Sequence, residues 1–177
     1  MTARTPVVAE LVTVSRSVQF VRYSKRELKA ISEVNALTSS EARGKGVSVR
    51  MRLAEDLPFI KGDRVQLQQV MLNLIINAID AMSSTSDGPQ ELTISTRMNE
   101  PGAVLVTLSD SGPGIAPGNI ERLFEPFYTT KTNGMGMGLS ICRPIIEAHG
   151  GRLWASANIP RGAILQFTVP VDPAVPP

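Results

Sequence analysis

The period of the hydrophobic positions changes several times along the chain, and each change marks a predicted element. Near the N-terminus the spacing alternates between four and three residues, in Val7, Leu11, Val14, Val18 and Val21. This spacing is typical of a heptad seam. It fits either an amphipathic helix packed on its own domain or a dimer-forming helix from a larger protein. We therefore predict an N-terminal helix over residues 1–24, as a possible remnant of a dimerisation helix.

The next segment continues as a helix and then changes period. An apolar helical face at Leu28, Ile31, Val34 and Leu37 predicts helix to about residue 42, before the glycines of residues 43–46 end it. Residues 47–53 alternate apolar and polar side chains, which indicates a half-buried strand. Asp63, with Gln66 as its capping-box partner, is predicted to open a helix over residues 65–82. That helix is apolar on most sides and is expected to be buried.

The second half of the chain predicts shorter elements. Strands are expected at residues 92–98 and 103–109, joined by a turn at 99–102, and again at 152–156 and 163–169. A short helical stretch is expected at 120–124, and a helix at 137–148 that Gly150 and Gly151 stop. Strands and helices do not alternate regularly, so we predict an α+β two-layer sandwich over residues 25–171. The proline-rich end, from Pro170 and above all residues 172–177, is expected to be frayed or disordered.

Composition excludes several classes of protein. The 177 residues are 42% hydrophobic, enough for one compact domain, and 18 Lys and Arg against 16 Asp and Glu give a formal charge of +2. No basic block alternates with aromatics, so no nucleic-acid partner is expected. The chain shows neither a signal peptide nor a membrane span, which predicts a cytoplasmic fragment whose parent protein can still be membrane-anchored. Cys142 and His149, the single cysteine and histidine, offer no zinc site, and Cys142 is expected in the core rather than as a reactive thiol.

Three polar or glycine-rich segments are candidates for chemistry. Asn73 and Asn77 lie four residues apart on one face of the buried helix. They are either ordinary amides that are hydrogen-bonded in the core or at the surface, or they face a cavity or ligand. Asp110 ends a strand and precedes Gly112 and Gly114, a pattern that suits a base-binding pocket. Residues 134–139 (GMGMGL) lead into a helix, whose N–H groups can hold phosphates, yet the run fits neither the Walker P-loop nor a dinucleotide fingerprint.

In their order along the chain, NLIIN, DSGPGI, LFEPFYTTK and GMGMGLSI resemble the N, G1, F and G2 boxes of the histidine kinase catalytic domain. The resemblance covers roughly residues 45–171, and AHGGRLWA at residues 148–155 is similar to the nitrogen-regulation and oxygen-sensing sensor kinases. It implies the Bergerat-type ATP-binding fold, with a mixed sheet, helices on one of its faces and a mobile ATP lid. It also implies ATP and Mg²⁺ as cofactors, a histidine-bearing dimerisation domain and a response regulator as partners, and a homodimeric full-length kinase.

The resemblance assigns roles to individual positions. Asn77 would coordinate Mg²⁺, and Asn73 would hold phosphates or the metal's waters. Asp110 would accept from the adenine amino group, and Lys131 would reach the phosphates from the lid, unless it is an ordinary solvated loop charge. Phe124 and Phe127 would pack the hinge of the lid. The remaining nucleotide-binding positions that it implies are Gly112, Gly114, Ile115, Thr130, Gly134, Gly136, Met137, Gly138 and Leu139.

Two positions depart from the family pattern. Residue 80 is Asp, where many members place a lysine that contacts phosphate, although acidic residues are normal for the nitrogen-regulation type. His149 precedes two glycines at a helix end, and no phosphoacceptor segment is found, so the chain is expected to bind ATP without phosphorylating itself. Two other functions stay open: a conformational ATPase, which Asn73 in place of a general-base glutamate disfavours, and a non-catalytic ATP-binding module or a serine kinase.

Overall fold

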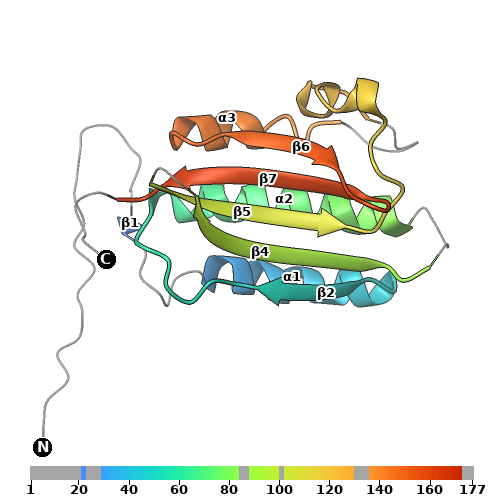
Figure 1. Ribbon diagram of the computed structural model, residues 1–177, viewed down its shortest axis with the longest axis horizontal. Helices are drawn as coiled ribbons and strands as arrows, with labels where there is room; N and C mark the ends of the chain where they lie inside the picture. The colour runs from blue at the N-terminus through green and yellow to red at the C-terminus, as the bar shows by residue number, and fades with distance from the viewer. Residues whose placement is uncertain (1–20, 23–28, 84–87, 100–101, 130–135, 173–177) are drawn as a thin grey trace, which may run out of the picture.

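The computed structural model describes residues 21–22, 29–83, 88–99, 102–129 and 136–172, in which five strands form one mixed sheet with the order β2–β4–β5–β7–β6. Helices α1, α2 and α3 lie together behind this sheet in Figure 1. The predicted two-layer α+β sandwich is therefore confirmed. The elements of the two layers are β2 (Ser48–Arg52), β4 (Glu91–Asn99), β5 (Ala103–Asp110), β6 (Leu153–Ala157), β7 (Ala163–Pro170), α1 (Lys29–Gly44), α2 (Arg64–Ser83) and α3 (Cys142–Ala148).

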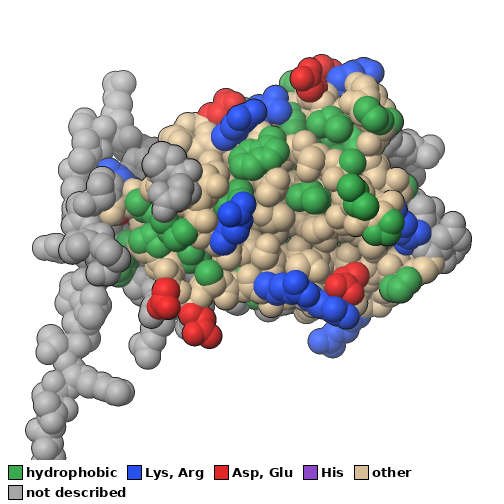
Figure 2. Space-filling view, viewed as in Figure 1, with side chains coloured by type: hydrophobic (Ala, Val, Ile, Leu, Met, Phe, Trp, Pro, Cys, Tyr) green, Lys and Arg blue, Asp and Glu red, His purple; other side chains and the backbone are tan. Residues whose placement is uncertain are grey.

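Alternation of side chains along the strands separates a core face from an open face. Strand β2 pairs in parallel with β4, and the other pairs in this sheet are antiparallel. Inward positions such as Leu92 and Phe167 are buried, whereas the outward Gln166 joins its neighbours through side-chain hydrogen bonds with Trp154 at 3.0 Å and Thr107 at 3.2 Å. Figure 2 shows this open face, where hydrophobic, basic and acidic groups are dispersed among other atoms. Within the part of the chain that the structure describes, helices thus cover one side of the sheet only (Figure 1).

Helix α2 forms the centre of the core. Its start is capped as predicted, because the Asp63 carboxylate accepts from the backbone N–H of Gln66 at 3.0 Å. Eight of its 20 residues are buried, and Leu74, Ile75 and Ile79 are fully enclosed. Such burial on several sides explains why the segment shows no narrow apolar stripe.

The helix expected from residue 137 begins only at Cys142. Residues 138–141 form turns instead. Pro144 supplies the physical reason, because proline has no N–H and is tolerated in the first turn of a helix but not in its interior. The end of α3 is as predicted: Gly150 adopts φ +74°, and a Cβ on Gly151 would lie 1.8 Å from the Thr168 carbonyl oxygen. The short helical stretch near residue 120 consists of two 3₁₀ turns, η1 (Pro117–Asn119) and η2 (Arg122–Phe124).

Both ends of the domain differ from expectation. Most of the predicted N-terminal helix lies outside the described residues, but β1 (Val21–Arg22) is a strand that pairs antiparallel with β3 (Lys61–Gly62). Extended pairing suits β-branched Val21 and satisfies backbone groups of β3. At the other end Pro170 belongs to β7, and Asp172 is buried and donates its N–H to the Phe59 carbonyl at 2.7 Å, so residues 170–172 are ordered and not frayed. None of the described helices is long and apolar enough to cross a membrane.

Candidate functional site

A cavity of about 410 Å³ lies between α2, the end of β5 and the segments that follow η2. It brings together several residues that the sequence singled out from different parts of the chain. Asn77, Asp110, Gly114, Ile115 and Leu139 all line it. The cavity is large enough for a small organic ligand and combines apolar walls with a few polar groups.

Asp110 is the most constrained polar group of this cavity. It is 5% exposed, and its Oδ1 atom accepts from the backbone N–H groups of Gly112 at 2.9 Å and Ala163 at 3.1 Å. Burial raises the pKa of the Asp110 carboxyl above its usual value, although these two hydrogen bonds act in the opposite direction. Because Oδ1 is used by the backbone, Oδ2 is the oxygen with which the side chain can accept from a ligand donor.

The hairpin between β6 and β7 holds Asp110 in place. Asn158 donates from its side-chain amide to the Asp110 carbonyl at 2.8 Å and to the Ser109 hydroxyl at 2.9 Å. Gly162 adopts φ +105°, and a Cβ there would lie 1.9 Å from the Asp110 carbonyl oxygen. This position therefore requires glycine. Sequence reasoning missed Asn158, Gly162 and Ala163, because their contacts join residues about fifty positions apart and no local pattern marks them.

Asn77 faces the cavity from the middle of α2. Its side-chain Nδ2 donates to the backbone carbonyl of Asn73 at 2.8 Å, which fixes the orientation of the amide group. A Cβ on Gly138 would lie 3.4 Å from the same Nδ2 atom. The segment that precedes α3 therefore packs closely against Asn77.

Asn73 occupies a different environment from Asn77. Its amide donates to the Cys142 sulfur at 3.7 Å, and the Cys142 thiol donates to the Gly138 carbonyl at 3.1 Å. Asn73 does not appear on the cavity wall. Burial raises the pKa of the Cys142 thiol to about 11, so the expectation of an unreactive core cysteine agrees with its surroundings.

The two phenylalanines have unlike positions. Phe124 is buried, and the Arg143 guanidinium lies 4.2 Å from the centre of its ring. Phe127 is 76% exposed with φ +66°, and its backbone N–H donates to the Gly136 carbonyl at 3.0 Å. A Cβ on Gly136 would approach the Phe127 backbone within 2.5 Å. Phe127 therefore contacts Gly136 through its backbone, while its side chain is exposed.

The other predicted positions divide into three groups. Gly112 donates to Asp110 but does not itself line the cavity, and Met137 is 43% exposed and also lies off the cavity wall. Thr130, Lys131 and Gly134 lie outside the described residues. Six further wall residues were given no role from the sequence. Ala78, Ala81, Leu123 and Leu165 are small or apolar and look like ordinary core positions, and Tyr128 and Thr129 follow Phe127 in the quoted LFEPFYTTK segment.

The residues present fit a magnesium nucleotide rather than a protein-held metal. Among the described residues, no group of three or more His, Cys, Asp or Glu side chains can hold a metal ion. Magnesium usually retains water and phosphate oxygens and needs only one or two protein oxygens. The amide oxygen of Asn77 on the cavity wall is a suitable single ligand of this kind.

Comparison with known proteins agrees with this geometry. A family model described as "Histidine kinase-, DNA gyrase B-, and HSP90-like ATPase" matches residues 62–173. The sensor protein FixL of Bradyrhizobium diazoefficiens is 43% identical over 142 residues, which cover 80% of this chain and 28% of FixL. This chain thus corresponds to less than a third of that relative.

Solved structures show the same arrangement. The catalytic domain of histidine kinase ThkA superposes with a TM-score of 0.74 at 33% identity, over 86% of this chain and 96% of that domain. A complex of ThkA with the response regulator protein TrrA matches with a TM-score of 0.73 at 31% identity, over 90% of this chain and 44% of the ThkA chain. The likeness therefore extends over nearly the whole of an isolated catalytic domain.

Proposed function

The chain belongs to the histidine kinase-, DNA gyrase B- and HSP90-like ATPase family as a catalytic ATP-binding domain of the sensor histidine kinase type, and we propose that it presents Mg·ATP to a histidine on a dimerisation domain. The observation that carries the proposal is the buried Asp110 carboxylate, fixed by two backbone N–H groups at the wall of a cavity that Asn77 also lines. In this proposal Asp110 binds the base and Asn77 acts at the phosphates.

Asp110 recognises the adenine ring. Its Oδ2 atom accepts a hydrogen bond from the exocyclic amino group, while Ile115, Leu139 and Leu165 offer apolar contacts to the faces of the ring. A hydrogen bond to a charged acceptor is stronger where water is excluded, and Asp110 is only 5% exposed. Guanine carries an oxygen acceptor in place of this amino group, so the same carboxylate disfavours it.

Asn77 holds the phosphate end of the nucleotide through Mg²⁺. When bound, the ion neutralises phosphate charge and orients the transferred group, as phosphoryl transfer requires. The chain's own task is to position it: the hydrogen bond from Asn77 Nδ2 to the Asn73 carbonyl holds the side chain in one orientation. Gly138 allows the backbone of the glycine-rich segment to come close to this amide. Lys131 and Thr130 complete the phosphate contacts from the lid.

Residue 73 favours transfer to a protein over hydrolysis. A conformational ATPase needs a carboxylate near this position to activate water, whereas Asn73 is a neutral amide whose donor is engaged by Cys142. The γ-phosphate is therefore left for a nucleophile from another domain. We place that histidine on a homodimeric dimerisation domain in the cytoplasm, where ATP is available, and the final receiver on a response regulator, by analogy with the ThkA–TrrA complex.

Titration calorimetry with ATP, in the presence and absence of Mg²⁺, tests the site assignment. We expect Asp110→Ala to weaken binding with or without metal, and Asn77→Ala to weaken only the magnesium-dependent part. Asp172→Ala, which removes another buried carboxylate, and Gln69→Ala, on the exposed side of α2, are matched controls. Binding of both site variants with the parent's affinity would show that nucleotide sits elsewhere.

A further inference from the structure

The cavity presents a charge problem for the ligand proposed above. Among the described residues that line it, Asp80 and Asp110 are acidic and none is Lys, Arg or His. ATP is a polyanion, and two carboxylates on the wall repel its phosphates. The charge of Asp110 is accounted for by the hydrogen bond that it accepts from the base, whereas Asp80 has no such role. Asp80 therefore needs a separate explanation.

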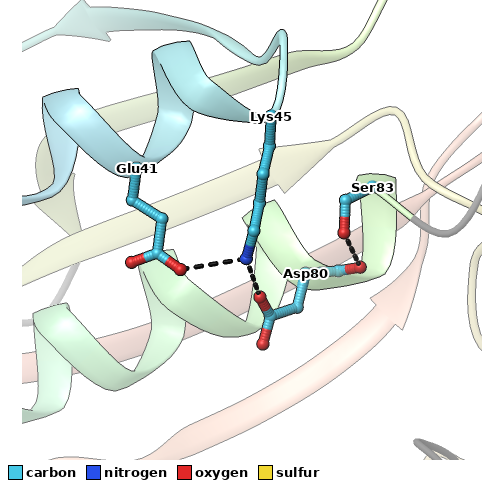
Figure 3. A network of polar contacts seen from close by, with 4 residues as sticks. All are labelled: Glu41, Lys45, Asp80 and Ser83. Carbon is cyan, nitrogen blue, oxygen red and sulfur yellow. Dashed lines mark hydrogen bonds and ion pairs between the residues drawn. The ribbon is translucent and has the colours of Figure 1, made fainter.

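Lys45 compensates the charge of Asp80. Its ammonium Nζ lies 2.6 Å from Asp80 Oδ1 and 2.9 Å from Glu41 Oε1, as Figure 3 shows. The two hydrogen bonds, with Asp80 as the larger cause, raise the pKa of Lys45 above its usual value, so the ammonium stays charged. The backbone N–H of Lys45 also donates to carbonyl oxygens in the last turn of α1, which fixes the origin of the side chain.

Asp80 and Glu41 differ in their relation to the cavity. Asp80 follows Asn77 by one helical turn on α2 and lines the cavity wall, whereas Glu41 belongs to α1 and does not. Lys45 reaches Asp80 across 35 positions of sequence, and the Glu41 contact is a local i,i+4 pair. Glu41 therefore orients the Lys45 side chain, and the ion pair with Asp80 connects Lys45 to the ligand site.

We propose that Lys45 is a positioning residue for nucleotide binding: it neutralises Asp80 and holds that carboxylate toward α1, away from the space that the phosphates occupy. The inference rests on the proposed function, and it concerns the phosphates rather than the base. It predicts that loss of Lys45 weakens the binding of a charged nucleotide and leaves the binding of an uncharged nucleoside unchanged. The penalty is electrostatic and therefore decreases with added salt.

The experiment measures the Kd of ATP and of adenosine by calorimetry, for the parent chain and for variants, at low ionic strength and at about 1 M salt, where the Debye length is about 3 Å. Lys45→Met is expected to raise the Kd of ATP roughly three- to thirtyfold at low salt, from the repulsion of partly screened charges a few ångströms apart. Its Kd for adenosine should stay at the parent's value. Arg43→Met, which removes an exposed charge from the same turn, is the matched control and should change neither.

A second variant separates neutralisation from direct contact. Asp80→Asn in the Lys45→Met background should restore ATP binding to near the parent's value, since no carboxylate is left to compensate, and Asp80→Asn alone should bind ATP at least as well as the parent. Failure of the double variant to recover would overturn the inference, and so would an equal loss for ATP and adenosine. A parent chain that binds no ATP refutes the proposed function itself, whereas a parent and Lys45→Met with equal ATP affinity refute only the role of Lys45.

Discussion

The imidazole Nε2 of His149 accepts a hydrogen bond from the backbone N–H of Asp63 at 2.9 Å, which joins the end of α3 to the start of α2. The other ring nitrogen, Nδ1, lies 2.7 Å from the Ile145 carbonyl oxygen and must carry the proton for that contact. The predicted capping box is thus half right. Asp63 caps Gln66, but the N–H of Asp63 is satisfied by a histidine 86 residues away rather than by the glutamine side chain.

We expect His149→Ala to destabilise the domain by about 1–2 kcal/mol, because a partly buried N–H loses its acceptor. Urea denaturation measures the loss, with Glu147→Ala, an exposed change on the same helix, as the control. His149 does not line the cavity, so ATP affinity should remain that of the parent. An unchanged unfolding midpoint would show that the histidine link contributes nothing to stability.

Local patterns predicted most of the fold, and non-local contacts account for what they missed. The buried helix α2 and strands β4 to β7 follow from period and turn residues alone. The start of α3 was predicted too early: the helix begins at Cys142, which places Pro144 in its first turn, where proline is tolerated. The hairpin residues that hold Asp110 were missed because Gly162 and Ala163 acquire this role only when β7 is placed beside β5.

Asp110→Asn should change both stability and base preference. Asn can still accept from Gly112 and Ala163 through Oδ1, and it removes a buried charge, so the variant is expected to match or exceed the parent's stability at neutral pH. Its Nδ2 then faces the ligand as a donor. ATP binding should weaken, and the ratio of GTP to ATP affinity should rise, which competition with a fluorescent nucleotide measures.

The raised pKa of Asp110 also predicts a pH dependence of stability. Between the usual value of 3.8 and the higher value in the folded state, the folded chain binds more protons than the unfolded one, so this group lowers stability as pH rises. The free energy of unfolding of Asp110→Asn should therefore increase relative to that of the parent as pH rises through this window. Below the window this difference should vanish. An advantage that is constant across the window would contradict the raised pKa.

Gly162→Ala should be far more damaging than the same change at an open glycine. The new Cβ would lie 1.9 Å from the Asp110 carbonyl oxygen at φ +105°, whereas Gly118 has nothing within 4 Å. We expect a loss of about 3 kcal/mol or more at position 162, from backbone strain together with overpacking. Gly118→Ala serves as the control in the same denaturation series. Equal unfolding midpoints for the two variants would refute the tight contact.

Cys142 should react slowly with thiol reagents in the folded protein. It is fully buried and its pKa is about 11, so little thiolate forms near pH 8. Labelling with a disulfide reagent should be fast in denaturant and slow without it.

Cys142→Ser keeps a hydroxyl that can donate to the Gly138 carbonyl, while Cys142→Ala does not, so the alanine variant should lose more ATP affinity if this bond positions Gly138.

The last prediction concerns phosphorylation of the chain itself. The sequence holds one histidine, and both nitrogens of His149 are engaged, Nε2 by the Asp63 N–H and Nδ1 by the Ile145 carbonyl. Attack on phosphorus requires an accessible lone pair, so the chain incubated with labelled Mg·ATP should acquire no acid-labile label. A histidine-bearing dimerisation domain supplied separately should become labelled, slowly, because the two domains lack the effective concentration of a tether. Label on the lone chain that disappears in His149→Ala would instead make His149 an acceptor and refute its structural role.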